Sequence, residues 1–120
     1  MNQIRQWQGV PTAIIDAWRT LFNATPATEG MNLSASCPVC GQRTLHRYYA
    51  LERAAPRELR GAAYQGPGSY WEWCSSCRSF EHMSGYVPAW WQVEPLAIDH
   101  ARLTAVPDLL DEVLGKRIRT

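Results

Sequence analysis

Hydrophobic and polar positions alternate with different periods along the chain, and the changes of period mark the expected elements. Ile14, Trp18 and Phe22 recur at helical spacing, which predicts a helix over residues 11–23. A second apolar stripe, with acidic residues in its first turn, predicts a helix over residues 107–115. The chain is therefore expected to begin and end in amphipathic helices.

Between the two helices the pattern favours strands. Residues 44–51 and 70–73 are rich in aromatic and aliphatic side chains, and residues 79–83 form a candidate third strand. The Gly-Pro-Gly-Ser run over residues 66–69 predicts a turn before the second strand. Residues 53–61 are expected to form a short helical turn or a loop. The middle of the chain is thus predicted to be a small antiparallel sheet.

The four cysteines of the chain form two Cys-x-x-Cys pairs. Two residues between the members of a pair let the backbone turn so that both sulfurs reach one metal ion. The pattern predicts a structural Zn²⁺ site with the ligands Cys37, Cys40, Cys74 and Cys77. Gly41 follows the first pair and tolerates positive φ, which helps that turn to close.

Other uses of the cysteines remain open at this point. Four thiolates also bind iron, and Arg78 stands where a glycine is expected, which leaves room for a distorted turn or for His46 or His82 as a ligand. The βαβ setting of a redox pair is not indicated. Paired disulfides require an oxidising compartment, and the first residues show no secretory signal. Reduced thiols in a cytoplasmic protein are therefore expected.

The two cysteine pairs, with a strand, a hairpin and a second strand between them, resemble zinc-ribbon domains; the resemblance rests on the four cysteines and Gly41. It implies a structural metal in a small antiparallel sheet. The expected fold is α+β, with a zinc-ribbon-like core over about residues 35–84 flanked by the N-terminal and C-terminal helices in a single domain, 1–120. Residues 71–77 and 87–91 also resemble small bacterial immunity proteins encoded beside polymorphic toxins.

Composition and motifs narrow the function classes. The chain has 120 residues and a formal net charge of +1, without the strong basic excess of a dedicated nucleic-acid binder. It holds no apolar run long enough to span a membrane. Phosphate-binding loops, nucleophile elbows and metalloprotease motifs are missing, and no histidine has a carboxylate at a telling spacing. The chain is expected not to be an enzyme.

Arginine and tryptophan are the residue types that point to a partner, because both are enriched in binding hot spots. The alternative is that the tryptophans fill the core of a small metal domain and that the arginines pair with Glu52 and Glu58. The candidate partner-binding residues are Arg47, Arg53, Arg57, Arg60, Trp71, Trp73, Trp90 and Trp91.

Together these features favour a non-enzymatic, zinc-binding protein-interaction module. The favoured form is an immunity protein, or antitoxin, that binds and inhibits a toxin. The alternative is a zinc-ribbon protein that binds DNA or RNA, with the arginines on phosphates and the aromatic rings on bases.

Overall fold

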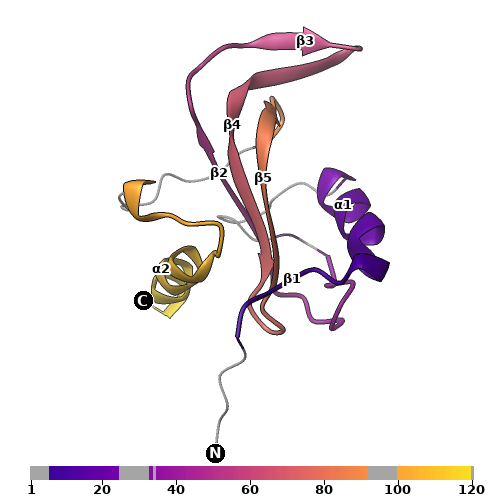
Figure 1. Cartoon of the computed structure of the whole chain (residues 1–120), viewed down its shortest axis with the longest axis vertical. Coiled ribbons are helices and arrows are strands. Elements are labelled where there is room, and N and C mark those ends of the chain that lie inside the picture. The colour runs from indigo at the N-terminus through magenta and orange to yellow at the C-terminus, as the bar shows by residue number, and fades with distance from the viewer. Residues whose placement is uncertain (1–5, 25–32, 34, 92–99, 120) are drawn as a thin grey trace, which may run out of the picture.

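A five-stranded sheet forms the centre of the protein, with one helix on each side of it (Figure 1). The structure is a computed structural model, and it describes residues 6–24, 33, 35–91 and 100–119. The elements in chain order are β1 (Gln8–Gly9), the 3₁₀ turn η1 (Thr12–Ile14), α1 (Ile15–Ala24), β2 (Leu45–Leu51), β3 (Arg57–Leu59), β4 (Ala62–Cys74), β5 (Ser79–Pro88), the 3₁₀ turn η2 (His100–Arg102) and α2 (Asp108–Arg119).

The long strand β4 organises the sheet. It pairs antiparallel with β5 along one edge, and with β2 and then β3 along the other. The short strand β1 pairs parallel with β5 and completes the order β1-β5-β4-β2. The hairpin of β3 and β4 extends beyond both helices (Figure 1). The sheet is therefore mixed, with β4 as its spine.

Alternation along the strands separates two hydrophobic cores. One core, the α1-side core, gathers Trp18 and Phe22 of α1 with Leu45 of β2, Leu33 and three of the four cysteines. The other, the α2-side core, is built from Tyr48, Trp71, Trp73 and Leu110. Each helix thus covers its own face of the sheet, and the cysteine pairs belong to the α1 side.

Hydrogen bonds from the sheet hold α2 in place. The indole N–H of Trp73 donates to the Asp111 carboxylate at 3.0 Å, and the Ser75 hydroxyl donates to the same oxygen. The indole N–H of Trp71 donates to the carbonyl of Thr104, just before the helix, at 2.7 Å.

The described helices include none that is long and apolar enough to cross a bilayer.

The zinc-ribbon-like sheet predicted from the sequence is wrong. The observed sheet has five strands, it includes a parallel pair, and the two helices are short, although the mixture of helices and sheet remains α+β. The predicted helix 11–23 is found as η1 and α1, and the predicted helix 107–115 begins at Asp108 and continues to Arg119. Strands β1 and β3 were not predicted, because each is only two or three residues long.

The turn predicted at residues 66–69 is also wrong, because β4 runs through it. The glycines there serve close packing. A Cβ on Gly66 would lie 2.5 Å from the carbonyl oxygen of Arg53, and one on Gly68 would lie 2.5 Å from that of Ala50. Gly66 also has φ +149°, at the irregularity where the register between β4 and β5 shifts. Glycine in this strand marks a close backbone approach instead of a reversal.

Candidate metal centre

The first cysteine pair lies in a tight turn just before β2. The N–H of Gly41 donates to the carbonyl of Cys37 at 2.8 Å, and the N–H of Cys37 donates to the carbonyl of Gln42 at 2.8 Å. The N–H of Val39 points at the Cys37 sulfur from 3.3 Å. Gly41 has φ +82°, as the sequence predicted for the residue after the second cysteine.

The second pair forms the same turn between β4 and β5. Cys74 is the last residue of β4, and the N–H of Arg78 donates to its carbonyl at 3.0 Å, as Gly41 does in the first pair. Arg78 adopts φ +58°, a conformation that costs a non-glycine residue about 1–2 kcal/mol. The arginine therefore does not distort the turn; it accepts the left-handed geometry that the turn needs.

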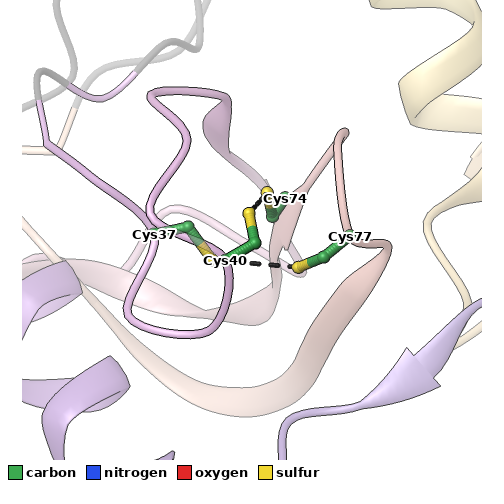
Figure 2. A group of neighbouring side chains, drawn as sticks. All are labelled: Cys37, Cys40, Cys74 and Cys77. Atoms are coloured by element: carbon green, nitrogen blue, oxygen red, sulfur yellow. Dashed lines mark hydrogen bonds between the residues drawn. The ribbon is translucent and has the colours of Figure 1, made fainter.

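The two turns bring the four sulfurs together at one point (Figure 2). All four Sγ atoms lie within 4.8 Å of one another. The Cys37–Cys77 distance is 3.8 Å and the Cys40–Cys74 distance is 3.7 Å. A tetrahedron with metal–sulfur bonds of about 2.3 Å has edges of about 3.8 Å. All four cysteines are free, since a disulfide requires about 2.05 Å.

Comparison of the chain with protein-family models, with curated protein sequences and with solved structures found no match. The four-cysteine cluster is therefore what the molecule itself offers as a functional site. Its geometry can hold a metal ion.

The surroundings of the cluster suit a cation. Burial raises the pKa of the Cys37 thiol to about 12 and also raises the pKa of Cys40, whereas at Cys77 the effect of burial is outweighed by hydrogen bonds, chiefly from Ser79, and the pKa is lowered. Thiolates in this setting need a positive charge beside them. The Thr44 hydroxyl lies 3.2 Å from the Cys74 sulfur and 2.7 Å from the hydroxyl of Ser76. Thr44 was not predicted as part of the site, because its sulfur partner is thirty positions away and no local motif links them.

The histidines considered as substitute ligands lie elsewhere. His46 packs against the ring of Trp73 with centroids 5.5 Å apart, and His82 stacks on Trp71 at 4.7 Å. Both rings belong to the α2 side of the sheet, across from the cysteines. Within the part of the chain that the structure describes, the four cysteines are the only group of three or more potential ligands close enough to share an ion.

His46 gives stability a dependence on pH. Burial lowers the pKa of its imidazole from 6.5 to about 4, and nearby Asp111 only partly opposes this. Below pH 6.5 the unfolded chain binds a proton at His46 that the native protein does not, so the His46 contribution to stability is complete above pH 6.5 and is lost towards pH 4. The loss reaches at most about 3 kcal/mol.

Denaturant unfolding of wild type and His46→Phe at several pH values tests this. The phenylalanine variant should lose less stability on acidification, since thiol protonation affects both proteins alike and cancels in the difference. Parallel pH profiles would contradict the assignment to His46.

The positive φ of Gly41 yields a second prediction. Gly41→Ala should lower the free energy of unfolding by about 1–2 kcal/mol, because a Cβ at φ +82° is strained although it meets no atom within 4 Å. Gly9→Ala is the matched control, since Gly9 also has open space around it but lacks a positive φ. Chemical denaturation of both variants measures the difference; equal stabilities would show that the turn does not require glycine.

The candidate partner-binding residues divide by exposure. Arg47 is 2% exposed, and the rings of Trp71, Trp73 and Trp91 are buried. Trp90 is 48% exposed. The exposed arginines among these candidates are Arg53, Arg57 and Arg60, all in or beside the β3–β4 hairpin. A partner would therefore contact Trp90 and the three exposed arginines before it reached the buried candidates.

Proposed function

We propose that this protein binds one Zn²⁺ through Cys37, Cys40, Cys74 and Cys77, that the metal is structural, and that the protein acts without catalysis as a protein-interaction module. The observation that carries the metal assignment is the approach of four free sulfurs to within 4.8 Å, with two separations at the edge length of a zinc tetrahedron.

A structural role follows from what the ion would join. The first pair belongs to the loop before β2, and the second to the turn between β4 and β5. Cys37, Cys74 and Cys77 pack in the α1-side core with Trp18 and Phe22. A metal bound here would join the loop before β2 to the turn between β4 and β5. Four thiolate ligands also fill the coordination sphere, so the ion has no open position for a substrate.

Elemental analysis of the purified protein tests the metal. One zinc per chain is expected, lost in Cys40→Ser or on treatment with a strong chelator. One iron per chain would show that the site binds iron instead of zinc. A metal-free protein that unfolds like the metal-loaded one would overturn the structural role.

The protein-interaction role is supported by the near-neutral charge, by the lack of a recognisable catalytic motif and by the exposed indole of Trp90. The specific role that we propose within this class is that of an immunity protein that blocks a toxin. Co-purification with the product of the adjacent gene, followed by titration of the two pure proteins, tests it. A pair that does not associate at micromolar concentrations would remove the toxin-inhibitor form.

Nucleic-acid binding has less support. Arg47 is enclosed in the protein, and the exposed arginines of the hairpin stand beside Glu52 and Glu58. Phosphate binding needs several accessible cations acting together. Titration with single-stranded DNA and RNA at low salt would decide the point; tight, salt-dependent binding would favour this alternative.

A further inference from the structure

A pocket of about 500 Å³ opens on the α1 side of the sheet, away from the cysteines. That volume lies in the range of sites that take one small ligand or one large side chain. Its walls come from the last turn of α1, the start of β4 and the end of β5. The aromatic rings that line it are Tyr64, Tyr70, Tyr86, Trp90 and Trp91.

The rings hold one another in fixed edge-to-face contacts. Tyr64 meets Tyr86 with centroids 6.0 Å apart, and Tyr70 meets Trp91 at 5.1 Å. Trp91 in turn meets Trp90 at 6.2 Å. Trp90 remains about half exposed, so the pocket has a rigid aromatic interior and an accessible indole at its mouth.

Three backbone oxygens at the pocket are already paired. The carbonyl of Ala63 accepts the N–H of Ala89 at 2.9 Å. The Gln65 amide donates to the carbonyls of Pro88 and Trp91 at 3.0 and 2.9 Å. The side chains of the lining still offer hydrogen-bonding groups, the Asn23 amide and the tyrosine hydroxyls. Five of the ten lining residues are aromatic, so the lining suits an aromatic group.

Both guanidinium groups and carboxylates lie near the pocket: Glu72 faces Arg47 across the β2–β4 pair, and Glu81 forms an ion pair with Arg19. Arg47 lies 4.1 Å from the ring centroid of Trp91, and Arg57 lies 5.5 Å from that of Tyr86 while donating to its hydroxyl at 2.8 Å. Arg57 pairs in register with the pocket residue Tyr64, so it shares that face of the hairpin. Its neighbour Glu58 points to the other face. Because Arg47 is buried opposite Glu72, Arg57 on the exposed hairpin is the cation that an anionic ligand would meet.

We propose that this pocket receives a bulky aromatic side chain from an acidic segment of a protein partner. The aromatic anchor packs against Trp90 and the tyrosines, and the flanking carboxylates of the partner face Arg57. This inference rests on the proposed protein-interaction role and adds the chemistry that the partner presents. It is independent of the metal, whose ligands lie outside the pocket lining.

The test uses three synthetic peptides and the full-length, metal-loaded protein. The probe is N-acetyl-Asp-Glu-Phe-Glu-Asp-amide; the comparisons replace phenylalanine by glycine, or all four acidic residues by lysine. Tryptophan indole N–H signals in NMR titrations report binding even when it is weak. The acidic aromatic peptide should bind at least about tenfold more tightly than either comparison, because loss of an anchor in a hot spot has an effect of that size.

Two variants locate the site. Trp90→Ala and Arg57→Glu should each weaken binding of the acidic aromatic peptide at least about tenfold. Arg102→Glu, an exposed charge reversal on η2 across the sheet, should leave it unchanged (Figure 1). Equal binding of the three peptides, no binding of any, or equal binding by the variants would overturn the proposal, as would preferential binding of adenosine monophosphate.

Failure of the pocket is distinguishable from failure of the protein-interaction role. If wild type binds a protein partner and Trp90→Ala and Arg57→Glu bind it equally well, the pocket assignment falls and the role stands. If the pocket selects the acidic aromatic peptide, the pocket assignment stands whichever partner is identified.

Discussion

Cys40→Ser is expected to abolish cooperative folding of the α1 side of the protein. Structural zinc contributes on the order of 10 kcal/mol to the folding of small modules, and the net stability of a domain is only about 5–15 kcal/mol. Cys40 is the one cysteine of the four that is not fully buried, so serine in its place disturbs packing least and reports mainly on the metal. Denaturant unfolding followed by circular dichroism, with metal content measured in parallel, gives the size of the loss.

Two controls separate the metal from the mutation. Chelation of wild type should reproduce the loss, whereas Gln42→Ser, an exposed change beside the same turn that keeps the backbone carbonyl accepting from Cys37, should not. Hydrogen exchange should increase most at the start of β2 and in the β4–β5 turn. A soluble Cys40→Ser protein with wild-type melting behaviour would show that the four sulfurs do not share a structural ion.

Arg47→Ala is expected to cost about 2–5 kcal/mol, the range for truncating a large buried side chain. The Arg47 guanidinium stacks on the rings of Trp91 and Phe22 and donates to the carbonyl of Phe22. That carbonyl lies in the last turn of α1, where helix oxygens lack intrahelical partners and a cation is favourable. Arg47 also faces Glu72 across the β2–β4 pair, where burial raises the pKa of the carboxyl to about 8 and Arg47 lowers it.

Arg47→Lys should recover only part of the loss, because an ammonium keeps the charge but has no planar face to stack between the rings. Arg60→Ala in the exposed turn of the hairpin is the matched control and should change stability by less than about 0.5 kcal/mol. Thermal and denaturant unfolding of the three variants compare them. An Arg47→Ala protein as stable as Arg60→Ala would mean that the buried guanidinium contributes nothing to holding α1 on the sheet.

The cysteine cluster was predictable because its information is local. Each Cys-x-x-Cys pair specifies its own turn, and only their meeting requires the fold. The equivalence of the two turns was less accessible: Arg78 does not look like Gly41, yet both donate to the carbonyl four residues back and both have positive φ. The backbone hydrogen bond, and not the residue type, decides that geometry.

Which of the candidate partner-binding residues are exposed was less predictable, because residue type does not report depth. Alternation correctly places Trp71 and Trp73 on one face of β4, but it does not say that α2 covers that face. Arg47 carries a charge that is usually exposed, yet the aromatic rings around it and the end of α1 make its burial favourable. The pocket combines residues from three elements distant in sequence, so no local pattern marks it.

Local sequence patterns were enough to predict two amphipathic helices, a strand-rich middle and a set of four cysteines at metal-ligand spacing, because helical period, strand composition and cysteine spacing act over a few residues. The positions of Gly66 and Gly68 inside a strand, the burial of Arg47 and the exposure of Trp90 became visible only in the folded chain. Those outcomes depend on which backbone or ring comes from elsewhere in the chain to lie against each residue. Long-range packing determines the burial of each of these residues, and their neighbours in the sequence do not encode that packing.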